Sequence, residues 1–331
     1  MASPIKVARC GPSDDAASKS KPWGHCTVDF PQAKHYRTAD EFFADVAIEL
    51  VVICTPNHRE FVEKALKSGK HVVVEKPFMT TSADADEIIE LAKAQGKVLT
   101  VFHNRRFDSD FRTLEDLVKK GALGDVREAD IHFDFPSPSW IAGWTQKEYT
   151  PGEGTHTVDQ ALHLFGRPTS VTGFLRSNRG VDSDVDDTHT IILQYGGDKK
   201  NLLVTIKTAI VSHMENQLRF FFGTCPQEER AIAAPAQPAI DPNFGVEDEH
   251  IWGTLTTTTE FDGAYQTCDE ATGRWVGKCP SLPGWYRGYY DNVAAAIRGR
   301  EEICVKPETA RDGLKVIELA RESHAKGATI P

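Results

Sequence analysis

Short apolar runs alternate with helical segments in the first third of the chain. Residues 50–54, 71–74 and 98–102 are almost continuously apolar, and segments with helical spacing separate them. Strands that are apolar on both faces and joined by crossover helices are typical of a parallel sheet covered on both sides. The pattern therefore predicts βαβ units over this part of the chain.

Residues that end or start helices agree with this interpretation. Gly69 and Gly96 each follow a helical segment, where glycine commonly ends a helix. Thr81 with Asp84 precedes the second segment as a capping pair does. The two crossover helices are therefore bounded at the expected places.

Beyond a polar helix at 110–120 the pattern changes to longer strands of alternating hydrophobicity. We predict strands at 126–135, 189–195, 202–210 and 217–222, and helices at 155–165, 285–297 and 308–325. Consecutive strands favour an α+β domain with a large open, mostly antiparallel sheet. The Ala- and Pro-rich stretch 231–242 is predicted as a surface loop. The predicted domains are 1–110 and 111–331.

Composition narrows the class of protein. The 331 residues are 40% hydrophobic and 26% charged, as in ordinary globular proteins. The net charge is −10 and no basic block occurs, so we expect no nucleic-acid partner. No apolar run reaches the roughly 18 residues of a membrane helix, and the start lacks a signal-peptide core. We therefore expect a cytoplasmic protein with no membrane partner.

The seven cysteines give no sign of a disulfide framework or a zinc site. They are odd in number, scattered, and never spaced as Cys-x-x-Cys. Buried or incidental thiols are the favoured interpretation.

Two tripeptides lie where chemistry is expected in a parallel sheet. Thr55-Pro56-Asn57 ends one apolar strand, and Glu75-Lys76-Pro77 ends the next. Ligands of such sheets bind beyond the carboxyl ends of the strands. The alternative is that Glu75 and Lys76 form a solvated strand end. No Gly-x-Gly-x-x-Gly occurs anywhere, although a nucleotide-binding βαβ unit normally opens with such a turn.

Several motifs together resemble one family. Besides the two tripeptides, they are the runs 69–78 and 102–111, Gly121-Ala122-Leu123-Gly124, Asp159-Gln160-Ala161-Leu162, and Trp252-Gly253-Thr254-Leu255. The chain is identified by them as similar to the glucose-fructose oxidoreductase/inositol dehydrogenase (Gfo/Idh/MocA) family, in a fungal-type branch. The resemblance covers almost the whole chain and implies an incomplete Rossmann-like parallel-sheet domain followed by a substrate domain.

The resemblance also implies a cofactor, NADP or NAD, and a small-molecule substrate such as a sugar or polyol. Lys76 and His156 would be catalytic, sharing the transfer of a proton, for which a semi-buried amine or imidazole is suited. The expected cofactor-binding residues are Arg9, Thr55, Pro56, Asn57, His58, Glu75, Lys76, Asn104 and Arg105. The expected substrate-facing residues are Asp134, Trp144, Asp159 and His163.

This chain departs from the family pattern by being shorter at four places. Arg9 resembles the arginine that follows the family's second strand and meets the 2′-phosphate of NADP, so the Gly-rich turn and the first helix are missing. We expect residues 5–9 to replace them as one fused strand. His58 follows Asn57 two residues early. A segment that carries an active-site aspartate is missing before Gly154-Thr155-His156, and a strand-turn is missing near 222–228.

His156, Asp159 and His163 share one face of the predicted helix. Three such ligands could bind zinc. Because Leu164 and Phe165 follow His163, a core or interface histidine is the stronger interpretation. The acidic run at 182–187 lacks the glycine and final glutamate of a calcium loop. We therefore predict no metal.

The sequence supports two alternative hypotheses about function. The first is an NAD(P)-dependent oxidoreductase acting on a hydroxyl or carbonyl of a sugar-like or specialised-metabolite substrate. The alternative is a catalytically inactive member that serves as a binding or regulatory protein, which the missing Gly-rich turn and aspartate favour. In both cases we expect a homo-oligomer formed through the open β-sheet.

Overall fold

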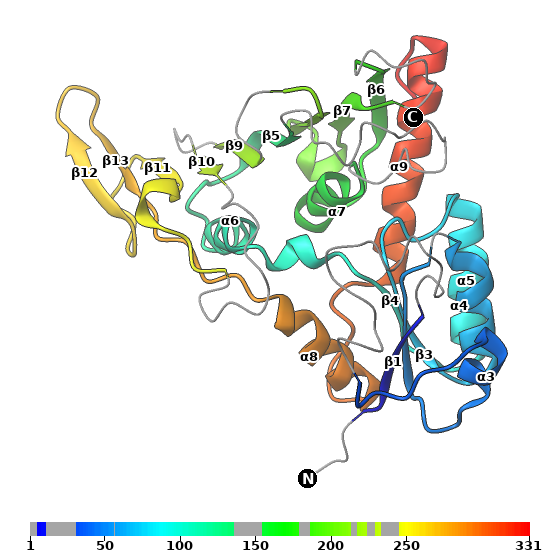
Figure 1. Cartoon of the computed structure of the whole chain (residues 1–331). Helices are drawn as coiled ribbons and strands as arrows, with labels where there is room; N and C mark the ends of the chain where they lie inside the picture. The colour runs from blue at the N-terminus through cyan, green and yellow to red at the C-terminus, as the bar shows by residue number, and fades with distance from the viewer. Residues whose placement is uncertain are drawn as a thin grey trace. The chain divides into compact units, whose positions relative to one another are not determined.

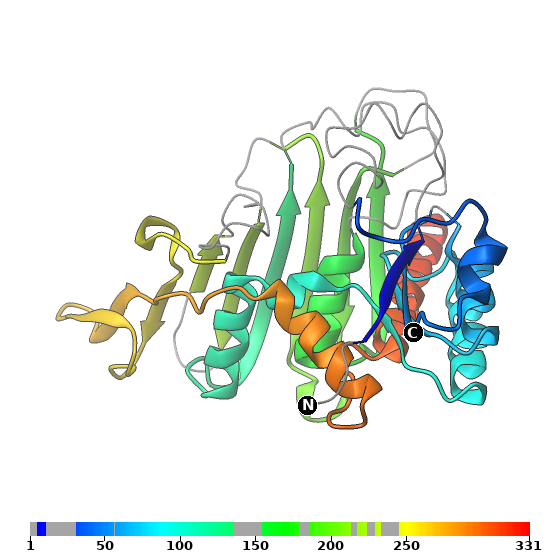
Figure 2. The same cartoon turned by 60° about the horizontal axis from the view of Figure 1, so that its bottom comes forward.

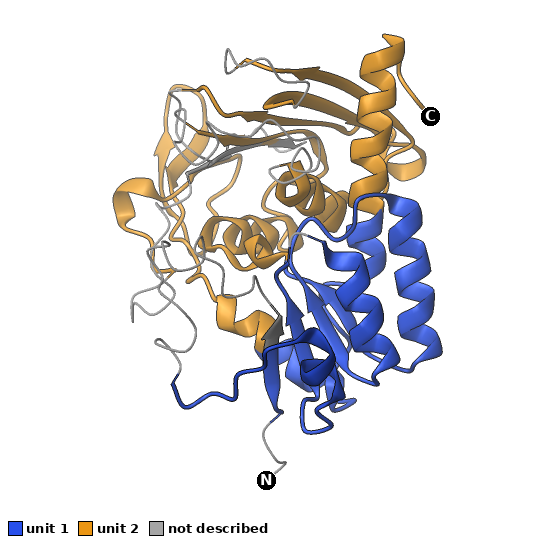
Figure 3. Ribbon diagram, turned by 45° about the vertical axis from the view of Figure 1, so that its right-hand side comes forward, with its two compact units in different colours: residues 1–102, 291–311 blue, residues 103–290, 312–331 orange. Residues whose placement is uncertain are grey.

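The computed structural model describes residues 5–10, 31–55, 57–135, 154–178, 186–212, 217–223, 229–232 and 245–331. The chain divides into two compact units (Figure 3). Unit 1 comprises residues 1–102 and 291–311, and unit 2 comprises residues 103–290 and 312–331. The predicted single boundary between residues 110 and 111 differs from this division, because residues 291–311 return to unit 1. Thr100 illustrates the return, since its hydroxyl donates to the carbonyl of Val305 at 2.8 Å.

Unit 1 contains the predicted parallel sheet. Its strands are β1 (Val7–Cys10), β2 (Leu50–Ile53), β3 (His71–Val74) and β4 (Leu99–Val101), in the order β1-β2-β3-β4 and all parallel. The helices between them are α3 (Ala39–Ala44), α4 (His58–Lys67) and α5 (Ser82–Ala94). Val72, Val73 and Val74 are completely buried, as expected for a strand covered on both faces. The Rossmann-like, incomplete sheet is confirmed.

The predicted helix ends are confirmed as well. The hydroxyl of Thr81 accepts the N–H of Asp84 at 3.0 Å and caps α5. Gly69 and Gly96 have φ values of 73° and 61°, a left-handed conformation that glycine adopts without steric penalty.

A first strand lies where it was predicted. Val7 to Cys10 pair in parallel with Leu50 to Ile53, residue for residue. The polar segment 11–30 that follows lies outside the described residues, and so does the side chain of Arg9. Within the described part of unit 1, β1 is the outer strand, and Val7 is 56% exposed.

Unit 2 is built on a nine-stranded sheet in the order β12-β13-β11-β10-β9-β5-β8-β7-β6 (Figures 1 and 2). The strands are β5 (Val126–Asp134), β6 (Ser170–Arg176), β7 (Thr188–Gln194), β8 (Leu203–Ala209), β9 (Gln217–Gly223), β10 (Glu229–Ile232), β11 (Thr254–Thr257), β12 (Tyr265–Asp269) and β13 (Arg274–Lys278). All neighbouring pairs are antiparallel except β5 and β8. The mostly antiparallel sheet is thus confirmed.

The helices of unit 2 explain which face of the sheet is apolar. They are α6 (Ser109–Lys119), α7 (Gly154–Phe165), the end of α9 (Pro307–Lys326) and the short helices η1 (Asn104–Phe107), η4 (Gly197–Lys199) and η5 (Glu249–Ile251). Helix α8 (Tyr286–Ile297) begins in unit 2 and continues into unit 1. In Figure 2, α6 and α7 lie on one face of the sheet. On β5, the buried side chains Ala129, Ile131 and Phe133 alternate with Glu128 and Asp130.

Helix α9 approaches β6 so closely that only glycine fits at one position. A Cβ on Gly173 would lie 2.2 Å from the carbonyl oxygen of Ala320, and the N–H of Gly173 donates to the hydroxyl of Ser323 at 3.0 Å. A glycine in the middle of a strand weakens the periodic pattern, and the sequence did not indicate β6. The short strands β10 to β13 were also not predicted, and residues 233–242 of the predicted loop lie outside the described residues.

Among the described residues, no helix combines the length and apolar character needed to cross a membrane.

Candidate functional site

The carboxyl ends of β2 and β3 present the first group of predicted residues. Thr55 follows β2, is buried, and donates its hydroxyl proton to the carbonyl of Asn57 at 2.9 Å. Asn57 precedes α4 as its N-cap residue, without a side-chain cap bond. Pro56 lies outside the described residues. Because β2 and β3 are parallel, these residues share one edge of the sheet with Glu75 and Lys76.

The Glu75-Lys76-Pro77 turn continues directly from β3. The N–H of Glu75 donates to the carbonyl of Ile53, which extends the strand ladder by one residue. The N–H of Lys76 donates to the carboxylate of Glu75 at 3.2 Å, and the Lys76–Pro77 bond is cis. The Lys76 side chain is therefore carried on a turn anchored to the central strands.

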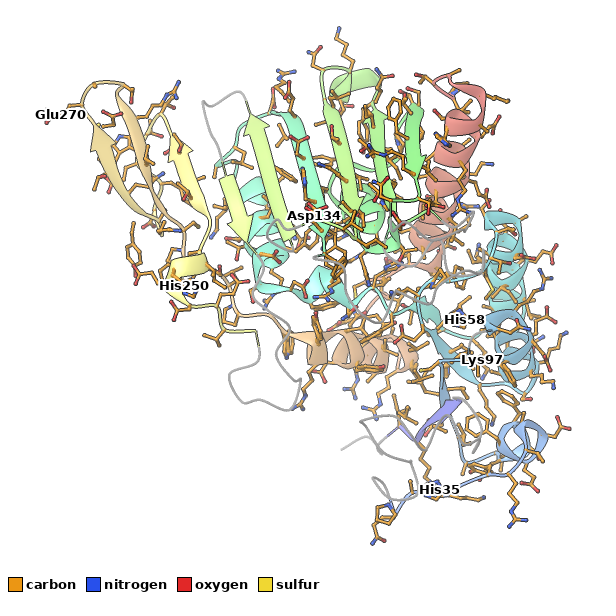
Figure 4. All side chains as sticks on the ribbon, turned by 45° about the horizontal axis from the view of Figure 1, so that its top comes forward. His35, His58, Lys97, Asp134, His250 and Glu270 are labelled. Atoms are coloured by element: carbon orange, nitrogen blue, oxygen red, sulfur yellow. The ribbon has the colours of Figure 1, made fainter. Side chains whose placement is uncertain are left out.

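His58 holds this turn from α4. Its Nδ1 lies 2.8 Å from the carbonyl oxygen of Pro77 and 3.3 Å from that of Phe78. Since a carbonyl only accepts, Nδ1 carries the proton. Burial lowers the pKa of His58, and the two carbonyls oppose this only partly. His58 was predicted to bind cofactor; here its ring is engaged by the backbone next to Lys76. Figure 4 labels His58 on unit 1.

In unit 2, α7 fixes the short helix η1 through a buried ion pair. Arg106 donates from Nε to one Asp159 oxygen at 2.7 Å and from Nη2 to the other at 2.6 Å. Both residues are buried. Burial alone would raise the pKa of Asp159, but the charge of Arg106 lowers it below its ordinary value, with help from His103 and His163. Two parallel hydrogen bonds of this kind fix both the position and the orientation of the Arg106 side chain.

Two further residues of α7 extend this attachment. Gln160 of α7 donates to the carbonyl of Arg105 at 3.1 Å. His163 lies 3.1 Å from Arg106 through Nδ1 and 2.8 Å from Glu115 through Nε2. The hydrogen bond from His163 lowers the pKa of Glu115 to about 2. Asp159 and His163, which were predicted to face substrate, are thus held by Arg106 and Glu115.

His156 lies in the first turn of α7 and is buried. Its ring meets that of His103 edge-on at 5.9 Å between centroids, and that of Phe133 at 6.5 Å. The Arg105 guanidinium lies over the Phe133 ring at 5.6 Å and also contacts Asp108 at 3.3 Å. The structure therefore places Arg105 and His156 on the same aromatic ring.

Asp134 ends β5 and is completely buried (Figure 4). One carboxylate oxygen accepts the N–H of Ala209 at 2.9 Å, and the other lies 3.3 Å from Nδ1 of His132. Trp144, the other predicted substrate residue, lies outside the described residues. Asn104 begins η1 and is half-buried.

Sequence reasoning missed three residues at this site: His103, Arg106 and His189. His103 and Arg106 lie in the run 102–111, so a motif marked them, but no spacing showed that Arg106 pairs with a residue 53 positions later. His189 is buried against Gly154, and burial lowers its pKa to about 4. In the part of the chain that the structure describes, no group of three or more His, Cys, Asp and Glu residues could hold a metal ion.

Comparison with known proteins shows which family the chain is related to. Residues 14–103 match the oxidoreductase family with an NAD-binding Rossmann fold, and residues 111–210 match the GFO/IDH/MocA C-terminal domain. An uncharacterized oxidoreductase of Schizosaccharomyces pombe is 35% identical, over 91% of this chain and 86% of its own length. A scyllo-inositol 2-dehydrogenase (NADP(+)) of Bacillus subtilis is 32% identical, over 91% of this chain and 84% of its own length.

Solved structures agree with these relatives. An oxidoreductase from Bacillus cereus superposes with a TM-score of 0.77 at 26% identity, covering 96% of this chain and 87% of its own. The resemblance predicted from the motifs is therefore confirmed, including its fungal relatives. The chain belongs to the Gfo/Idh/MocA family of oxidoreductases, which use NAD(P).

Proposed function

We propose that this protein is an NAD(P)-dependent oxidoreductase that acts on a CH–OH group of a sugar-like or polyol substrate. The observation that carries the proposal is the Glu75-Lys76-Pro77 turn, anchored at the carboxyl edge of the parallel sheet by His58. Family membership supports the redox activity, and the relative named as a scyllo-inositol 2-dehydrogenase supports a polyol as the substrate class.

The residues at this edge suit one end of the cofactor better than the other. A nicotinamide and its ribose would bind beside α4, where several polar groups lie. These are the hydroxyl of Thr55, the amide of Asn57, the carboxylate of Glu75 and the ammonium of Lys76. The sequence has no Gly-rich turn for the diphosphate, and residues 11–30 lie outside the described part. We therefore expect Arg9 and the first turn of α4 to supply the phosphate contacts, and cofactor binding to be weak.

When bound, the nicotinamide accepts or supplies the hydride. The chain's own residues handle the proton. Lys76 and His156 share this task, with one of them accepting the hydroxyl proton as the alcohol is oxidised and returning it in the reverse direction. Arg105, which lies over Phe133 beside His156, orients the substrate or the cofactor. Asp134 stands on the substrate side in this proposal, at the end of β5, with its buried carboxylate accepting from the N–H of Ala209.

The test uses the full chain. Binding of NADPH and NADH is followed by nicotinamide fluorescence, and oxidation of scyllo-inositol and myo-inositol by absorbance of the reduced cofactor. We expect saturable cofactor binding, and turnover that falls at least about 100-fold in Lys76→Ala and His156→Ala. Lys93→Ala, which removes an exposed ammonium from α5, is the matched control and should retain turnover. A folded protein without saturable cofactor binding would reject the oxidoreductase and favour the inactive relative.

We further propose a cytoplasmic homo-oligomer that forms through the face of the unit 2 sheet opposite α6 and α7. One row across that face consists of His132, Lys207, Thr190 and Phe174 on adjacent strands. Phe174 is 51% exposed, so its ring offers apolar area that a second copy of the chain could bury. Sedimentation velocity should show an oligomer that Phe174→Lys dissociates; a monomeric wild type would contradict this.

A further inference from the structure

Two buried imidazole rings meet beside the first turn of α7. His103 lies directly before η1 and is 4% exposed, and His156 is 6% exposed. Their centroids lie 5.9 Å apart with the planes at 82°, so the edge of one ring meets the face of the other. Such an edge-to-face contact restricts how far either ring can rotate.

His103 also lies close to the carboxylate of Asp159. Its Nδ1 lies 3.8 Å from the Oδ2 of Asp159, the oxygen that also accepts from Nε of Arg106. Arg106 and Asp159 form two parallel hydrogen bonds in the interior, which hold both side chains in place. A chain of contacts thus leads from Arg106 through Asp159 and His103 to His156.

We propose that His103 is a positioning residue that acts through His156, an inference that rests on the proposed role of His156 in proton transfer. The edge-to-face contact with His103 fixes the plane of the His156 imidazole. Because two imidazolium ions at this separation repel each other, protonation of one ring disfavours protonation of the other.

The charged and titratable groups around the two rings come from five elements. Arg106 and Arg105 lie on η1, Asp159 and His163 lie on α7, and Glu115 on α6 reaches the set through His163. His189 of β7 lies against Gly154 in the first turn of α7 and interacts with the charge of Asp134 on β5. The positive charge of Arg106 and the negative charge of Asp159 compensate each other within their ion pair.

The kinetic test compares His103→Phe with His103→Gln, using NADP+ and scyllo-inositol. Phe preserves the ring edge but loses the polar contact to Asp159, whereas Gln preserves a hydrogen-bonding group without the ring. We expect kcat to fall about tenfold in His103→Phe while KM stays within about twofold, because the substrate contacts remain. The acid limb of kcat/KM should move to higher pH by about one pH unit, because the imidazole whose protonation opposes that of His156 is then absent. His103→Gln should restore part of kcat.

A double mutant separates positioning from a direct role. In a His156→Ala background, His103→Phe should cause no further loss of kcat, because the residue through which it acts is absent. Equal and independent losses in the two backgrounds would overturn the proposal, and so would wild-type kcat and pH dependence in His103→Phe.

A spectroscopic readout keeps the inference testable whatever the substrate is. Histidine-labelled full chain is titrated by NMR, and the ring signals of His156 are assigned by their loss in His156→Gln. His103→Phe should shift these signals and move their titration to higher pH. Tyr195→Phe, a change elsewhere in the interior of unit 2, should not. Unchanged His156 signals in His103→Phe would overturn the positioning role. If this coupling is present while His156→Ala retains turnover, the proposed function fails instead.

Discussion

The two units hold their proposed catalytic groups by different means. In unit 1, the turn that carries Lys76 is fixed by strand ladders and by a His58 ring that donates to a backbone carbonyl. In unit 2, the region of His156 is fixed by side chains that carry charge, with Arg106 and Asp159 at the centre. One unit uses the backbone and the other uses an interior ion pair.

This difference predicts which unit loses more stability on substitution and in acid. Backbone contacts of the kind made by His58 are worth about 1 kcal/mol each and vary little with salt. A buried ion pair contributes little net stability when intact, but removing one partner leaves an unpaired charge in the interior. Unit 2 should therefore respond more strongly than unit 1 to a single substitution and to acid.

The largest expected effect comes from removing one member of the ion pair. Asp159→Ala leaves the buried guanidinium of Arg106 without the carboxylate that accepts the hydrogen bonds from its Nε and Nη2. We expect a loss of about 3–5 kcal/mol in the free energy of unfolding, measured by urea denaturation followed by near-UV circular dichroism.

The control removes both charges together. Arg106→Met combined with Asp159→Leu replaces the pair by apolar side chains of similar size, and it should recover most of the stability lost in Asp159→Ala. Recovery of stability without recovery of turnover would show that the pair also orients the η1 segment. If Asp159→Ala unfolds at the urea concentration of the wild type, the ion pair is not what holds α7 to η1.

The same contrast explains what could be predicted from the sequence. The strands of unit 1 were predicted because apolar runs such as 71–74 are local signals, and Thr81 and Gly69 mark helix ends by chemistry that acts over a few residues. Lys76 could be placed at the end of β3 because a strand end is also a local feature, whereas its proposed role came from the family resemblance. The fused β1 strand was predicted because the missing turn left one apolar segment to pair with β2.

The centre of unit 2 could not be predicted in this way. Arg106 and Asp159 are 53 residues apart, and nothing in their spacing distinguishes a partner from a solvated charge. Asp159 and His163 were assigned to the substrate because they share a helix face with His156, yet a shared face also suits contacts with η1 and α6. Strand β6 was missed because Gly173, required by the close approach of α9, interrupts its pattern.

The second expected effect is acid sensitivity that originates in unit 2. Burial lowers the pKa of His189 to about 4, and Arg321 adds to this while Asp134 opposes it. In the unfolded chain the pKa of a histidine is about 6.5. Between these values the unfolded state binds the proton and the folded state does not, so stability falls as the pH is lowered.

The shift corresponds to a loss of about 3 kcal/mol between pH 7 and pH 4, with no contribution from His189 above its unfolded pKa. Urea midpoints measured across this range should fall less steeply in His189→Leu than in the wild type. Parallel curves for the two proteins would mean that His189 is not the titrating group.

The smallest effect should come from unit 1. His58→Phe fills the same space but cannot donate to the carbonyl of Pro77, so a half-buried acceptor loses its partner. We expect a loss of about 1–2 kcal/mol in stability at pH 7.5, together with a lower kcat, because the turn that carries Lys76 is less tightly held. His58→Gln keeps a side-chain N–H and should retain more of both. If His58→Phe and His58→Gln match the wild type in stability and kcat, then the strand ladder alone fixes the turn, and the hydrogen bond from α4 is dispensable.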